Sequence, residues 1–135
     1  MKAIVISLLL LFIYAGIGSA VTADMPDCAV DERPCTKKIG AVEIVFDIKP
    51  KPVKAMRELS FAVTLKGTVT NRLILDLGMP GMYMGKNEVV LEKTADGIYT
   101  GKGVIPRCPS GKRLWRAKII NHGKTIAEFL FNVSS

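Results

Sequence analysis

The chain has only one histidine, His122, and this scarcity excludes most catalytic and metal sites that depend on imidazole. His122 precedes a glycine between two strand-like segments, where it is expected to be a turn residue. The sequence also lacks paired catalytic carboxylates, a Ser-His-Asp set, a phosphate-binding loop and an HExxH motif. We therefore do not expect an enzyme.

Nucleic-acid binding is also not expected. The formal net charge is +7, but there is no RNP, zinc-finger or basic-helix pattern, and the basic residues are scattered among strand-like segments. In an exported protein, such charge most often serves solubility or docking to acidic surfaces.

The longest apolar run, residues 3–18, is slightly short for a membrane span of roughly 20 residues. It follows Lys2 and precedes two small-x-small sites, at residues 18–20 and 21–23. This order is typical of a secretory signal, so residues 1–23 are interpreted as a signal peptide of a periplasmic or secreted protein. The alternative is an uncleaved anchor in the inner membrane, which would then be the chain's only membrane contact.

After residue 23 no helical stripe is present, and apolar residues alternate with polar ones. Residues 24–38 are interpreted as a cysteine-containing tail, and residues 39–135 as one all-β domain. The predicted fold is a seven-stranded, immunoglobulin-like antiparallel β-sandwich, with Trp115 in its core and a bulge at Gly101 and Gly103. Its strands are expected at residues 41–48, 59–66, 73–77, 89–95, 98–105, 114–120 and 125–133, and the prolines at 50 and 52 end the first of them.

Residues 77–85, Leu-Gly-Met-Pro-Gly-Met-Tyr-Met-Gly, place Met79, Met82 and Met84 in one short loop. Soft thioether sulfurs so close together are suited to Cu(I). Met82 and Met84 are two residues apart, so an extended segment points both side chains to the same side. The alternatives are that the methionines cover the core, or form an adaptable apolar patch that grips a partner.

Strand direction predicts which loops meet. In an antiparallel sandwich each connection reverses the chain, so the connections after strands one, three and five lie at one end. These connections hold Met56, the methionine loop and Cys108, respectively. His122 follows strand six and is expected at the opposite end.

The three cysteines allow one disulfide and one free thiol in an oxidising compartment. We expect Cys28 to pair with Cys35, because the same parity argument places Cys35 at the end opposite Cys108. Cys108 would then be free to join Met79, Met82, Met84 and Met56 as a metal ligand. Pairing of Cys108 with Cys28 remains the alternative.

Residues 76–87, together with the Gly-Ile-Tyr-Thr-Gly-Lys-Gly strand at 97–103 and the Trp-containing strand, resemble the YtkA-like/FixH-like family. The resemblance extends over residues 42–133. It implies an exported or membrane-anchored bacterial β-sandwich linked to copper handling or cytochrome oxidase assembly, with Met79, Met82 and Met84 as ligands. Unlike copper-carrier sandwiches that bind Cu(II), the chain has no histidine near this loop, which argues against Cu(II).

The end of the sandwich that is predicted to carry the methionine loop is also strongly basic. This charge repels a stored cation, lowers the pKa of Cys108 and favours docking of an acidic partner. We therefore expect transient Cu(I) binding and delivery to a copper-accepting or oxidase-assembly protein. The alternative is a metal-free accessory module that docks a partner through the same loop and basic residues. The expected docking residues are Lys51, Lys54, Arg57, Lys86, Arg107, Lys112 and Arg113.

Overall fold

The computed structural model describes residues 24–135. The predicted signal segment, residues 1–23, lies outside the described residues. Over the described part the protein is all-β, as expected from the alternating pattern. Its eight strands are β1 (Cys35–Ile39), β2 (Val42–Lys49), β3 (Glu58–Lys66), β4 (Arg72–Gly78), β5 (Glu88–Ala95), β6 (Ile98–Val104), β7 (Leu114–Asn121) and β8 (Lys124–Asn132).

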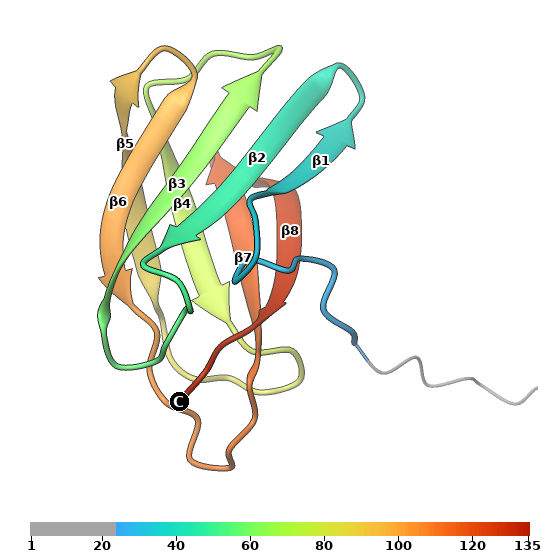
Figure 1. Cartoon of the computed structure of the whole chain (residues 1–135). Helices are drawn as coiled ribbons and strands as arrows, with labels where there is room; N and C mark the ends of the chain where they lie inside the picture. Colours follow the sequence, from blue (N-terminus) through green and yellow to red (C-terminus); the bar gives the residue numbers. More distant parts are fainter. Residues whose placement is uncertain (1–23) are drawn as a thin grey trace, which may run out of the picture.

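All eight strands form one antiparallel sheet in the order β1-β2-β3-β6-β5-β4-β7-β8. The sheet is folded on itself, so that β6, β3, β2 and β1 lie in front of β5, β4, β7 and β8 (Figure 1). Phe46 of β2 stacks on Phe129 of β8 with ring centroids 5.2 Å apart, so the two halves share one core. Trp115 is 2% exposed in this core, as predicted.

Strand alternation decides which side chains are buried. In β3 the buried residues are Leu59, Phe61, Val63 and Leu65, each two positions from the next. This is the pattern of a strand with one face on the core and one face toward solvent. β2 ends at Lys49, directly before Pro50, as predicted.

The sequence analysis missed one strand. β1 overlaps the end of the segment interpreted as a tail, and it pairs along the edge of β2 from Cys35–Phe46 to Ile39–Val42. Its sequence, Cys-Thr-Lys-Lys-Ile, has no alternation of apolar and polar residues, because neither of its faces is fully buried. This strand also reverses the chain once more, so Cys35 lies toward the C-terminal half of β2, which leads into the connection that carries Met56. The expectation that Cys35 lies opposite Cys108 is therefore wrong.

The cysteine assignment itself is confirmed: Cys28 and Cys35 form a disulfide, and Cys108 is free and buried.

The bulge is not where it was predicted. β6 pairs in continuous register with β3 through Gly101 and Gly103, and the register of the sheet shifts instead between Lys93 and Ala95 of β5. The two glycines allow β6 to approach β5 closely. A Cβ atom at Gly101 would lie 2.4 Å from the carbonyl oxygen of Val90, so an alanine there would clash with the backbone of β5. These glycines let β6 pass tightly over β5 where the sheet folds.

Candidate functional site

Three loops form one end of the protein (Figure 1). They are the connections β2–β3, β4–β5 and β6–β7, which hold Met56, the methionine loop and Cys108. His122 lies in the β7–β8 turn at the opposite end. Strand parity thus correctly predicted which loops meet, because the additional strand β1 precedes all three of them. We call this part of the molecule the methionine end.

The methionine loop is held by tight turns. The N–H of Met82 donates to the carbonyl of Met79 at 3.3 Å, and Pro80 and Gly81 occupy the corner, with Gly81 at a φ of 71°. Proline followed by a left-handed glycine is typical of a type II turn. At the other end of the loop, the side-chain amide of Asn87 donates to the carbonyl of Val104 at 3.0 Å. The methionines are therefore presented by a constrained segment.

The three methionines of this loop differ in burial. Met79 is only 3% exposed and belongs to the core, whereas Met82 and Met84 are half-buried and pack against the core margin. Tyr83 stands between them and is 87% exposed. Met79 is therefore part of the core, and Met82 and Met84 are better placed to contact a ligand from solvent.

Cys108 meets the methionine loop directly. Its Sγ lies 3.8 Å from the Sδ of Met82, although 26 residues separate the two in the sequence. Cys108 is 4% exposed, and the N–H of Gly111 donates to its carbonyl at 3.0 Å, which closes a turn after Cys108. The structure therefore pairs a thiol from the β6–β7 loop with a thioether from the β4–β5 loop.

The pKa of Cys108 is lowered from its ordinary value, as predicted, but mainly for a different reason. The largest cause is the hydrogen bond with the hydroxyl of Ser110, whose Oγ lies 3.0 Å from Sγ. Burial opposes this effect, and the backbone N–H groups of Ser110 and Lys112 add to it. The positive charge of Lys112 makes the smallest contribution. Local donors, more than the basic surroundings, therefore favour the thiolate.

Met56 is less closely associated with this pair. Its N–H donates to the carbonyl of Ile105 at 2.8 Å, so its backbone joins the base of the Cys108 loop. Its side chain, however, is 63% exposed rather than packed on the core. Met56 lies at the methionine end, but its side chain is exposed, whereas those of Met82 and Met84 pack against the core.

The basic residues at this end are not equivalent. Lys51 pairs with Asp47 at 2.7 Å and also donates to the carbonyl of Val30, so it holds the N-terminal tail. Lys86 pairs with Glu88 at 3.6 Å. Arg113 donates to the carbonyl of Val133 at 3.1 Å and so anchors the C-terminal segment. Of the predicted docking residues, those that are exposed and form no ion pair with a carboxylate are Arg57, Arg107, Lys112 and Arg113, and Lys54 is half-buried and also forms none.

A cavity of about 190 Å³ adjoins the thiol. Its lining includes Cys108, Arg107, Lys112 and Trp115. Within residues 24–135 there is no group of three or more His, Cys, Asp or Glu that could hold a metal ion. The sulfur donors that the structure brings together at this end are the thiol of Cys108 and the thioether of Met82.

Sequence reasoning missed Ser110. Its position two residues after Cys108, in Cys-Pro-Ser-Gly, was the available signal, because a small polar residue in such a turn can donate back to the preceding side chain.

None of the described residues forms a helix that is long and apolar enough to cross a membrane. Comparison with known proteins finds no matching family model, no matching curated protein and no matching solved structure.

Proposed function

We propose that this protein is an exported β-sandwich domain of the YtkA-like/FixH-like kind that binds Cu(I) transiently and passes it to an acidic partner protein. The folded sheet is interpreted as an immunoglobulin-like sandwich, extended by the edge strand β1. The observation that carries the proposal is the pair of sulfurs at the methionine end: a Cys108 thiol with a lowered pKa, 3.8 Å from the thioether of Met82.

This separation suits one shared ion. Two sulfurs each bonded at about 2.3 Å to one metal, at the angle of a trigonal site, lie about 4 Å apart. Little movement is then needed to bind the ion, and Met84 or Met79 would complete a trigonal set. A thiolate supplies the negative charge that thioethers lack, and soft sulfur ligands favour Cu(I) over Cu(II).

The surrounding charge favours transfer over storage. Arg107 and Lys112 lie on the same loop as Cys108 and line its cavity. They raise the cost of a bound cation and attract an acidic surface, which speeds encounter with a partner. A partner offering its own thiolate could then take the ion from a site that holds it with few ligands.

A Cu(I) titration tests the proposal. The protein, purified from an oxidising compartment so that Cys28–Cys35 stays intact, is titrated anaerobically against a competing Cu(I) chelator. We expect Met82→Ala and Cys108→Ser each to weaken binding at least about tenfold, a loss that even supporting residues of metal sites can cause. Met56→Ala is the matched control, because Met56 lies at the same end but is exposed. Equal affinities for Met82→Ala and Met56→Ala would contradict the proposal.

A metal-free docking module is the second candidate, and one observation favours it. Tyr83 is 87% exposed at the tip of a constrained loop, and amphipathic aromatic side chains of this kind are enriched in interfaces. On this alternative, Tyr83→Ala weakens partner binding while all the Cu(I) affinities above stay equally low.

A further inference from the structure

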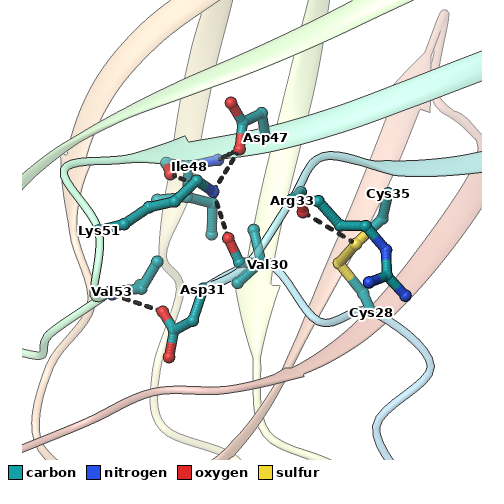
Figure 2. A network of polar contacts seen from close by, with 9 residues as sticks. All are labelled: Cys28, Val30, Asp31, Arg33, Cys35, Asp47, Ile48, Lys51 and Val53. Carbon is teal, nitrogen blue, oxygen red and sulfur yellow. Dashed lines mark hydrogen bonds and ion pairs between the residues drawn. A yellow bond between two sulfur atoms is a disulfide. The ribbon is translucent and has the colours of Figure 1, made fainter.

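Within the predicted N-terminal segment, residues 27–31, which we call the tail from here on, connect three parts of the fold that are far apart in sequence. It is tied to β1 by the Cys28–Cys35 disulfide, to β8 through Asp27, and to the β2–β3 loop through Val30 and Asp31. Figure 2 shows the disulfide and the polar contacts of Val30 and Asp31 side by side.

The contact with β8 covers a strand edge. The N–H groups of Asp27 and Cys28 both donate to the carbonyl of Leu130 at 2.9 Å, and a carboxylate oxygen of Asp27 accepts from the N–H of Leu130 at 2.8 Å. Lys37 of β1 pairs with the same carboxylate at 2.6 Å. Asp27 thus joins the two edge strands, β1 and β8, across the gap between them.

The contact with the β2–β3 loop leads toward the methionine end. Asp31 accepts a hydrogen bond from the N–H of Val53 at 2.6 Å, and the ammonium of Lys51 donates to the carbonyl of Val30 (Figure 2). Three residues after Val53, the N–H of Met56 bonds the carbonyl of Ile105. Ile105 lies three residues before Cys108. A continuous set of contacts therefore runs from the disulfide-bound tail to the loop that carries the free thiol.

We propose that the Cys28–Cys35 disulfide is a redox-sensitive clasp that holds the tail on β8 and on the β2–β3 loop, and that a dithiol reductant opens it. Cys35 is half-buried, whereas Cys28 is 4% exposed, so an incoming thiolate reaches the sulfur of Cys35. A cavity of about 420 Å³ borders the Cys28 side of the disulfide, and Cys35 is not among its lining residues.

Reduction proceeds by thiol–disulfide exchange. A thiolate of the reductant attacks Sγ of Cys35, the bond between the two sulfurs breaks, and Cys28 leaves as a thiolate that takes up a proton. The second thiol of the reductant then attacks the mixed disulfide, which releases the Cys35 thiol and the oxidised reductant. The protein gains two electrons and two protons, and the tail is then held by its hydrogen bonds and ion pair and by the packing of Val30 and Cys28 on the core. Copper plays no part in these steps, so the clasp stands or fails independently of Cu(I) binding.

Amide hydrogen exchange of the full chain, oxidised and after treatment with dithiothreitol, tests the clasp. We expect the amides of Val53 and Leu130 to exchange about tenfold faster after reduction, the change expected for one hydrogen bond to a charged group. The amide of Ala117, in the centre of β7, should stay protected. Unchanged exchange at Val53 and Leu130 overturns the proposal, and so does equal acceleration at Ala117, which would mean that reduction unfolds the whole domain.

Two further measurements separate the clasp from a passive covalent staple. Asp31→Ala in the oxidised protein should accelerate exchange at Val53 and leave Leu130 unchanged, whereas Glu32→Ala, the exposed neighbour, should change neither. Brief treatment with a monothiol, followed by acid quenching and peptide mapping, should give the adduct on Cys35. An adduct confined to Cys28 would overturn the assigned point of attack.

Discussion

The hydroxyl of Tyr99 provides a sharp test of how the end opposite the methionine loop is held. Tyr99 is fully buried in β6, and its hydroxyl donates to the carbonyl of Thr70 at 2.7 Å and accepts from the N–H of Thr70 at 3.2 Å. Thr70 is itself 6% exposed in the β3–β4 connection, so water does not readily replace the lost partner. Tyr99→Phe leaves two buried backbone groups unsatisfied. Each such group costs about 1–3 kcal/mol, and we expect a total loss of about 2–3 kcal/mol because the N–H contact is long.

Urea denaturation followed by fluorescence measures this loss as a lower midpoint with an unchanged slope. For a domain of this size the same loss corresponds to a melting temperature lower by about 8–12 °C. Tyr83→Phe is the control, because the side chain of Tyr83 is 87% exposed and should tolerate the change. If Tyr99→Phe costs no more than Tyr83→Phe, the buried hydroxyl does not stabilise the β3–β4 connection and the reasoning is wrong.

Three further predictions concern the close approach at Gly101, the hydroxyl of Ser110 and the basic residues Arg107 and Lys112. Gly101→Ala places a Cβ 2.4 Å from the carbonyl oxygen of Val90 and should destabilise the fold by about 1–3 kcal/mol in urea denaturation, whereas Lys102→Ala should cost less than 0.5 kcal/mol. Ser110→Ala removes the main cause of the lowered pKa of Cys108, so the pH profile of its alkylation should move to higher pH. An unshifted alkylation profile in the variant would refute the role of Ser110. In the unmodified protein, ionisation of this thiol stabilises the fold fully above the pKa of the unfolded chain, and this stabilisation is lost as the pH falls through the lower pKa of the folded protein. Reversing the charges of Arg107 and Lys112 to glutamate should abolish salt-dependent binding to polyglutamate on a column, and unchanged retention would exclude this loop as an acidic-partner surface.

The sequence predicted the strands well where each had one buried face. Leu59 to Leu65, with a large apolar residue at every second position, allows one register only. β1 has no such pattern, because it lies at an edge where its backbone pairs with β2 while its side chains are mostly exposed. Gly101 shows a second limit: glycine in a strand signals either a bulge or a close approach, and only the position of β5 distinguishes them.

For the candidate site, strand direction alone predicted that Met82 and Cys108 share an end. It could not predict that their sulfurs come within 3.8 Å, because that distance depends on the two turns, at Pro80–Gly81 and after Cys108. The same limit explains why Lys51 was assigned to a docking surface: its partners, Asp47 and the carbonyl of Val30, are brought together by the tail.

The contact between Asp27 and Leu130 also orders events during synthesis. The two residues are 103 positions apart, and Asp27 is made first, so its carboxylate and the N–H groups beside it stay without their strand partner until β8 has been made. Pairing over such a separation is entropically costly and typically late in folding. The edge of the sheet is thus closed where residues 27 and 28 meet β8, and a chain that stops before β8 would leave the tail nothing to close against.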